Sequence, residues 1–146
     1  MRKKTRKWAA LLLPGAGEKS FCTGEDLSAY DENGGCQTIM EHGFAGITER
    51  VRAKPIICAA NGAAVAGGLE IAVSCDLIVA ADHARFGLSE VKVELLATSG
   101  GLIRLPKLIP QKIAAEMCLS GKLISAQRAY EVGLVNLRGS GGPGNG

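Results

Sequence analysis

Two glutamates in a glycine-rich stretch are the residues of this chain best suited to acid–base chemistry. Glu70 follows the pair Gly67-Gly68, and Glu90 follows Phe86-Gly87-Leu88-Ser89. A diglycine that leads into an apolar run predicts a helix N-terminus, where unpaired backbone N–H groups and the helix dipole stabilise an anion. Two carboxylates beside such a terminus indicate proton transfer next to an oxyanion hole.

Glu70 carries more of this argument than Glu90. It lies inside the apolar run Leu69–Val73, where burying an unpaired carboxylate is costly, and a catalytic role is a good reason to tolerate that cost. The alternative is that Glu70 merely complements the dipole at a helix start. Glu90, in Ser89–Lys92, equally fits an exposed turn, so its weight comes from being paired with Glu70.

A series of short motifs runs in unbroken order through residues 8–137 of the chain. They are Phe21–Leu27, Lys54–Gly62, Ala66–Ala72, Ser74–Asp76, Ala84–Glu90, Ser99–Leu105, Gly121–Ala126 and Gly133–Asn136. The series resembles the crotonase superfamily, also called the enoyl-CoA hydratase/isomerase family. One glycine motif alone is weak support, whereas an ordered series of them is specific.

The resemblance implies a role for each matching position. The backbone N–H groups of Glu25 and Gly67 would form the oxyanion hole for a thioester oxygen. Glu70 would be the general base that deprotonates water, and Glu90 the acid that protonates the α-carbon. The positions implied to contact the substrate are Glu25, Asp26, Leu27, Ser28 and Gly67.

The implied reaction is reversible addition of water to a 2-enoyl-CoA thioester, as in fatty acid β-oxidation. Syn addition needs one proton taken from water and another delivered to carbon, while enolate charge gathers on the thioester oxygen. Relatives that only shift a double bond often keep one acid, so the presence of both favours a hydratase. A carnitinyl-CoA dehydratase or an enoyl-CoA isomerase of the same family is the alternative within this class. A catalytically inactive fragment or interaction remnant is the alternative from another class.

The chain departs from the family pattern after Glu90. Glu94, Ala97 and Thr98 stand where relatives usually carry a glycine and then a Pro-Gly pair. Glycine at such a position commonly serves a special backbone angle or a close approach, so these departures bear on activity more than on family membership. Ser28 stands where many relatives have a basic residue near the coenzyme A phosphates.

The apolar patterns predict alternating strands and helices. We expect a buried strand at residues 8–13, a helix at 35–52 and a second strand at 55–60, and a long crossover of this kind implies parallel pairing. A short helix at 67–75, a strand at 77–81 and helices at 110–119 and 125–132 follow. Ser125 is the expected N-cap of the last helix, and Gly133 its stop.

The fold class implied by the resemblance is α/β, a crotonase-like (ClpP/crotonase) spiral of repeated strand-strand-helix units, incomplete at both ends. We divide the chain into a basic tail at 1–7, a partial crotonase-like core domain at 8–137 and a Gly-rich disordered tail at 138–146. Relatives normally add N-terminal elements and C-terminal helices, and the full-length relatives form homotrimers or hexamers.

Composition fits a single globular domain: of 146 residues, 47% are hydrophobic and 21% charged. The net charge of +3 is concentrated in the basic start, which is typical of a solvated tail, so we expect no nucleic-acid partner. No apolar run of about 18 residues predicts a membrane span. Five cysteines without metal-like spacing favour a reducing, cytoplasmic compartment and no metal site. Coenzyme A belongs to the acyl-CoA substrate, so no separate cofactor is expected.

Overall fold

Two four-stranded sheets form the framework of the protein. The computed structural model describes residues 9–26 and 41–139, so the predicted tail at 1–7 lies outside the described residues. One sheet has the order β1-β3-β5-β8 and the other β2-β4-β6-β7. The strands are β1 (Leu11–Pro14), β2 (Ser20–Cys22), β3 (Ile56–Ala60), β4 (Ala63–Val65), β5 (Leu77–Ala81), β6 (Arg85–Gly87), β7 (Ile124–Ser125) and β8 (Leu137–Gly139).

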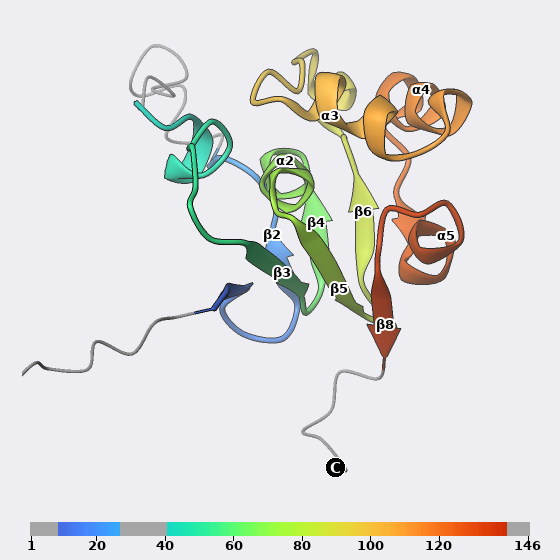
Figure 1. Ribbon diagram of the computed structural model, residues 1–146. Coiled ribbons are helices and arrows are strands. Elements are labelled where there is room, and N and C mark those ends of the chain that lie inside the picture. The colour runs from blue at the N-terminus through green and yellow to red at the C-terminus, as the bar shows by residue number, and fades with distance from the viewer. Residues whose placement is uncertain (1–8, 27–40, 140–146) are drawn as a thin grey trace, which may run out of the picture.

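Helices connect the strands and cover one end of the sheets (Figure 1). The short helix α2 lies in the middle of the molecule, next to β3, β4 and β5, while α3, α4 and α5 lie together on one side. The α-helices are α2 (Gly67–Ser74), α3 (Gly101–Leu108), α4 (Gln111–Ser120) and α5 (Ala126–Glu131). Two 3-10 turns, η1 (Phe44–Gly46) and η2 (Glu90–Val93), lie in the loops.

The chain alternates between the two sheets as it advances. β3 and β4 are followed by α2, and β5 and β6 by η2 and α3, so each turn adds one strand to each sheet. β1 pairs with β3, β3 with β5, and β5 with β8, all in parallel. The other sheet is parallel from β2 to β6 and antiparallel only between β6 and β7. The predicted α/β spiral of strand-strand-helix units is therefore confirmed.

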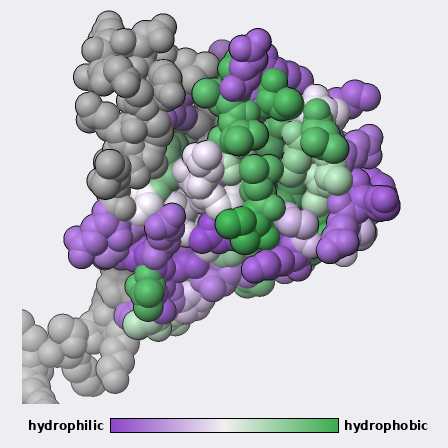
Figure 2. All heavy atoms as spheres, turned by 90° about the horizontal axis from the view of Figure 1, so that it is seen from above, coloured by the Kyte–Doolittle hydropathy of each residue, from purple (hydrophilic) through white to green (hydrophobic). Residues whose placement is uncertain are grey.

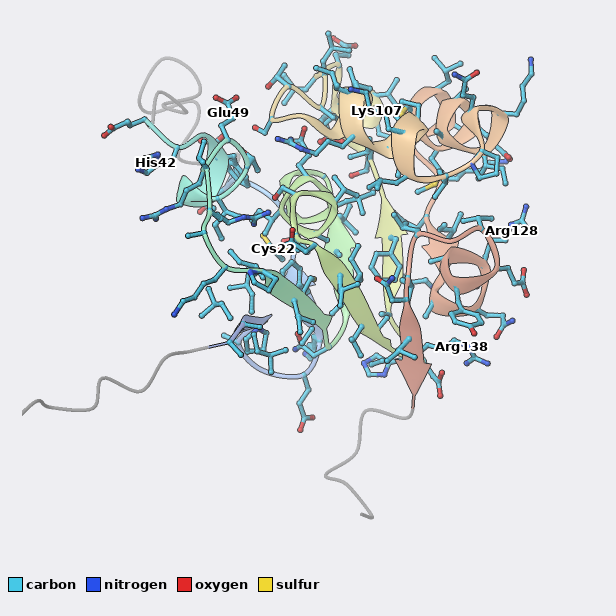
Figure 3. All side chains as sticks on the ribbon, in the orientation of Figure 1. Cys22, His42, Glu49, Lys107, Arg128 and Arg138 are labelled. Carbon is cyan, nitrogen blue, oxygen red and sulfur yellow. The ribbon has the colours of Figure 1, made fainter. Side chains whose placement is uncertain are left out.

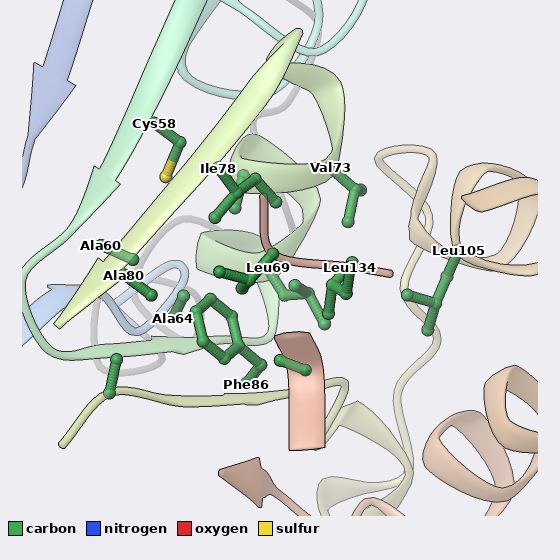
Figure 4. Close-up of a cluster of buried hydrophobic side chains, with 14 of the residues drawn as sticks. Cys58, Ala60, Ala64, Leu69, Val73, Ile78, Ala80, Phe86, Leu105 and Leu134 are labelled. Atoms are coloured by element: carbon green, nitrogen blue, oxygen red, sulfur yellow. The ribbon is translucent and has the colours of Figure 1, made fainter. Parts of the chain in front are cut away.

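The core fills the space between the sheets and around α2 (Figure 4). Every residue of α2 is buried, so this helix is enclosed on all sides rather than amphipathic. Leu69 of α2 and Phe86 of β6 are among the largest side chains with no exposed surface. Gly68 lets α2 approach β2, because a Cβ atom there would lie 1.9 Å from the Cys22 carbonyl oxygen. Cys22 lies next to α2 (Figure 3).

Most of the elements expected after residue 54 are present. α2, β3 and β5 match the predicted segments within one residue, and α4 follows Pro110 as its N-cap. The Ser125 side chain accepts a hydrogen bond from the Arg128 N–H at 3.1 Å, which confirms it as the N-cap of α5. Gly133 takes a positive φ of 84° just after that helix.

The helix predicted over residues 35–52 is wrong for its described part. Residues 41–52 form turns around η1, and residues 35–40 lie outside the described residues. Gly43, Ala45 and Gly46 all have positive φ, which an α-helix does not accommodate. Val51, near the end of the predicted helix, is 97% exposed.

Both ends of one sheet also differ from expectation. The first strand was predicted to be buried, yet Leu12 is 60% exposed because β1 is an edge strand that pairs only with β3. The disordered tail was predicted from residue 138, yet Arg138 and Gly139 belong to β8. They pair with Ala80 and Ala81, and the Arg138 guanidinium binds the Asp82 carboxylate. The remainder of that tail lies outside the described residues.

One helix was not expected from the pattern. α3 contains Pro106, which lacks an N–H and normally marks a helix boundary. The helix is short, so Pro106 lies in its last turn. Leu105, just before the proline, is fully buried and anchors α3 to the core.

Candidate active site

The predicted site residues lie at the carboxyl ends of three neighbouring parallel strands. Glu25 follows β2, Gly67 follows β4, and Glu90 follows β6. Since β2, β4 and β6 are adjacent and parallel, the loops that leave their carboxyl ends meet at one edge of the sheet. Open α/β sheets commonly bind ligands at this edge.

A cavity of about 710 Å³ opens at this edge. It is lined by Thr23, Glu25, Phe44, Ala66, Gly67, Glu70, Ser89, Glu90, Lys92, Val93, Glu94, Leu95, Leu96, Thr98 and Ser99. Both predicted catalytic glutamates and both predicted oxyanion-hole positions are thus brought to one cavity. Hydrophobic side chains gather on the face of the molecule seen in Figure 2. Among the residues that line the cavity, Leu96 is 70% and Val93 51% exposed. An apolar wall of this kind suits an acyl chain.

The backbone at the start of α2 is held in a strained conformation. Ala66, the N-cap, has φ 52° and ψ −127°, which non-glycine residues rarely adopt. A Cβ atom on Gly24 would lie 3.1 Å from the Gly67 nitrogen, so the loop after β2 packs directly against the first N–H of α2. Gly24 itself has φ 96°. The segments that carry the Glu25 and Gly67 amides are therefore in contact.

Glu70 is buried in the first turn of α2 and is 3% exposed. Its Oε1 accepts a hydrogen bond from the Gly101 N–H at 2.8 Å. Burial raises the pKa of Glu70 and the charge of Glu90 adds to this, while hydrogen bonds from Gly101 and Ser99 oppose it. Glu70 and Glu90 both line the cavity, so a molecule bound there can meet both carboxyl groups.

Glu90 begins η2 and is half-buried. Desolvation raises the pKa of its carboxyl group, with a smaller opposing contribution from its own backbone N–H. Among the described residues, its buried Oε2 has no hydrogen-bond partner. A carboxyl group with a raised pKa and an unengaged oxygen is suited to donate a proton to a bound molecule.

The segment from Ser99 to Arg104 holds the Glu70 carboxylate in position. The sequence did not predict this function. The Arg104 Nη1 donates to the Ser99 carbonyl at 3.1 Å, and its Nη2 donates to the Thr48 carbonyl. A Cβ atom on Gly100 would overlap the Arg104 guanidinium, and one on Gly101 would lie 3.1 Å from the Glu70 Oε1. The Gly100-Gly101 pair in the sequence is the signal that could have revealed this close packing.

Phe44 is a second lining residue that the sequence did not single out. A Cβ atom on Gly67 would lie 2.6 Å from the Phe44 ring, so the ring covers the start of α2. Among the predicted substrate contacts, Asp26 is exposed and does not line the cavity. Leu27 and Ser28 lie outside the described residues.

Glu94 stands at one of the departures from the family pattern and has an unusual backbone conformation. Glu94 follows η2 with φ 59° and ψ 27°, the left-handed region that favours glycine. Of the other two departures from the family pattern, Ala97 is buried and Thr98 lines the cavity. Within the described ranges, no three His, Cys, Asp or Glu side chains are grouped to hold a metal ion. No helix in those ranges combines the length and apolarity needed to span a bilayer.

The model of the enoyl-CoA hydratase/isomerase family matches residues 2–137. The chain belongs to this family. It is 48% identical over 127 residues to (E)-benzylidenesuccinyl-CoA hydratase of Thauera aromatica, covering 86% of the chain and 50% of that relative. It is 43% identical over the same length to carnitinyl-CoA dehydratase of Escherichia coli K12, covering 86% of the chain and 49% of the relative.

Solved structures of family members agree. The crystal structure of enoyl-CoA hydratase from Mycobacterium tuberculosis H37Rv superposes with a TM-score of 0.84 at 46% identity, over 92% of this chain and 52% of that chain. The chain therefore spans about half the length of the relatives that it matches. The crotonase fold is thereby established for this part of the family sequence.

Proposed function

We propose that the chain carries the acid–base and oxyanion machinery of an enoyl-CoA hydratase, which adds water reversibly across the double bond of a 2-enoyl-CoA thioester. The observation that carries this proposal is the single cavity that holds Glu70, Glu90, Glu25 and Gly67. Membership of a hydratase and isomerase family supports it independently.

Each residue has a distinct part in the proposed reaction. The N–H groups of Glu25 and Gly67 donate to the thioester oxygen, where negative charge develops as the enolate forms. Glu70 removes a proton from water as the water attacks the β-carbon, and Glu90 delivers a proton to the α-carbon. The raised pKa of Glu90 supports the acid role, because burial favours the protonated form of its carboxyl group.

The same site run in reverse is a dehydratase. Two of the relatives are a hydratase and a carnitinyl-CoA dehydratase. The proposed activity is therefore that of a hydro-lyase, which adds water or removes it. An isomerase needs only one of the two acids, and the presence of both in one cavity favours hydration. We further propose a reducing, cytoplasmic location, a role in β-oxidation and a trimeric or hexameric assembly for the whole protein.

The test follows the absorbance of crotonyl-CoA as water adds to its conjugated double bond. We expect Glu70→Gln and Glu90→Gln each to lower turnover by about two to four orders of magnitude, with little change in substrate binding. Glu131→Gln is the matched control, since Glu131 is an exposed residue on α5. Near-normal hydration by Glu70→Gln would make Glu70 structural and favour an isomerase that uses Glu90. A folded wild-type chain without turnover would favour the inactive fragment.

A further inference from the structure

A pair of thiols lies at the end of α2 that is remote from the cavity. Cys58 is on β3 and fully buried, while Cys75 is the C-cap residue of α2 and is partly exposed. The Cys75 thiol donates to the Ile71 carbonyl at 3.3 Å and packs against the buried cluster that contains Cys58. An interaction between the two thiols raises the pKa of Cys58 and lowers that of Cys75. Figure 4 shows Cys58 on its strand beside the buried cluster. Neither thiol has a part in the proposed hydration.

Backbone hydrogen bonds hold the two cysteines in place. The Ile56 N–H donates to the Asp76 Oδ2 at 2.7 Å, and the Asp76 N–H donates to the Ile56 carbonyl at 2.9 Å. Ile56 is two residues before Cys58 on the same strand, and Asp76 directly follows Cys75. The turn after α2 is thus fastened to β3, and Cys75 is held beside the strand that carries Cys58.

A guanidinium group lies beside Cys75. The Arg52 Nη2 donates to the Ser74 carbonyl at 2.5 Å and lies 3.7 Å from the Asp76 Oδ2. Among the described residues, the buried Arg52 Nη1 has no hydrogen-bond partner. The Cys58 thiol, together with this positive charge, lowers the pKa of Cys75, while burial and the Asp76 carboxylate oppose that shift. The same contact and burial raise the pKa of Cys58.

These features divide the two thiols into different chemical roles. A partly exposed thiol that readily gives a thiolate is accessible to oxidants, and a second thiol next to it can resolve the oxidised product. Cys75 has the exposure and the cationic neighbour, whereas Cys58 has no exposed surface. Cys118 lies apart from this cluster, and burial raises the pKa of its thiol.

We propose that Cys58 and Cys75 form a peroxide-sensitive redox site in which oxidation joins them by a disulfide. The Cys75 thiolate attacks one oxygen of hydrogen peroxide, and the O–O bond breaks. The other oxygen departs as hydroxide, and Cys75 becomes a sulfenic acid. The Cys58 thiol then attacks the Cys75 sulfur, and its proton departs with the hydroxyl group as water. Two thiols and one peroxide give one disulfide and two waters, so the sulfurs lose the two electrons that the peroxide gains.

The disulfide is detected by peptide mapping after treatment of the reduced chain with hydrogen peroxide and then iodoacetamide. Trypsin leaves both cysteines on the peptide 53–85, because Pro55 prevents cleavage after Lys54. We expect this peptide to carry no alkyl group and to weigh two hydrogen atoms less than its reduced form. Cleavage after Glu70 separates the two cysteines. The two pieces should stay joined until dithiothreitol is added.

Variants assign the roles of the two thiols. Cys75→Ser should abolish the reaction, and Cys58→Ala should leave a sulfenic acid on Cys75 that dimedone traps. Cys118→Ser is the matched control and should form the same linkage as the wild-type chain. Full alkylation of both Cys58 and Cys75 after peroxide, or linkage of either one to a different cysteine, would overturn the proposal. The wild-type peptide map gives this answer even if a core variant does not fold.

Discussion

Glu70 and Glu90 lie in surroundings that favour their neutral forms. For both groups, burial is the largest cause of a raised pKa. Glu70 keeps hydrogen bonds from the Gly101 amide and from Ser99, which partly stabilise its charged form. Two carboxyl groups in one cavity with different donors can hold different protonation states, which is what a base and an acid require.

The stability of the folded chain should fall as the pH rises through the raised pKa values of these two glutamates. The folded state binds their protons more tightly than the unfolded state, so their contribution is complete below the ordinary glutamate pKa of about 4.3. It is lost above the folded-state values. Urea unfolding between about pH 4 and pH 8 measures this. The double variant Glu70→Gln/Glu90→Gln should lose this part of the pH dependence, and parallel curves for the two proteins would contradict it.

Glu94 departs from the family pattern, and its backbone is strained. A residue with a Cβ atom is less stable in the left-handed region than glycine, typically by about 1 kcal/mol. Relatives usually carry glycine at this position, and glycine commonly serves a special backbone angle or a close approach. The structure shows that the special backbone angle is present, and Glu94 is a poor residue for it.

Replacing Glu94 by glycine should stabilise the chain. We expect Glu94→Gly to raise the free energy of unfolding by about 0.5–1 kcal/mol, because relief of strain exceeds the extra chain entropy of glycine. Glu94→Ala is the control, since it removes the carboxylate but keeps the Cβ atom. It should bring no comparable gain in urea unfolding. An equal gain from alanine would trace the effect to the charge instead.

At the scale of elements, Arg104 joins three segments that are distant in the sequence. It lies on α3, and its guanidinium binds carbonyl groups of Thr48 in the loop after η1 and of Ser99 just before α3. The Ser99–Gly101 turn in turn contacts Glu70 on α2. The position of the Glu70 carboxylate thus depends on an arginine that does not itself line the cavity.

Removing this guanidinium should weaken both the fold and the site. We expect Arg104→Met to lower the free energy of unfolding by about 2 kcal/mol, because carbonyl groups lose a charged donor. Turnover should fall more than substrate binding, because the Ser99–Gly101 turn would no longer hold the Glu70 carboxylate in position. Arg128→Met is the control: Arg128 is labelled on α5, away from α2 (Figure 3), and its ion pair with Glu131 is exposed. That variant should change stability by less than about 1 kcal/mol.

Local signals predicted the elements unevenly, for physical reasons. Regular apolar runs with a cap or a stop residue, as in α5 with Ser125 and Gly133, gave correct helices. The apolar spacing in residues 41–52 was misleading, because glycines with positive φ interrupt it. α3 was not predicted, because Pro106 normally marks a helix boundary. The strands β2, β4, β6 and β7 are too short to produce a clear alternating pattern of apolar and polar residues.

At the scale of the whole molecule, the arrangement of the sheets could not be read from local pattern. Two interleaved sheets and an ordinary doubly wound sheet have similar alternations of strand and helix. The ordered motif series supplied the spiral, and with it the meeting of loops after β2, β4 and β6. Ser99 and Arg104 were not assigned roles because their contacts are with backbone carbonyls or with Glu70, which the sequence does not specify.

The parallel pairing of distant strands also bears on the order in which the chain folds. Among the neighbours in the β1-β3-β5-β8 sheet, β3 and β5 are separated by the shortest stretch of chain, so they close the least costly loop. We expect β3, α2 and β5 to be structured in the transition state, and β8 to dock later. In stopped-flow experiments, Ile78→Val should therefore slow folding, while Val135→Ala, just before β8, should mainly speed unfolding. The helix that bears Glu70 would then be assembled before the last strand joins its sheet.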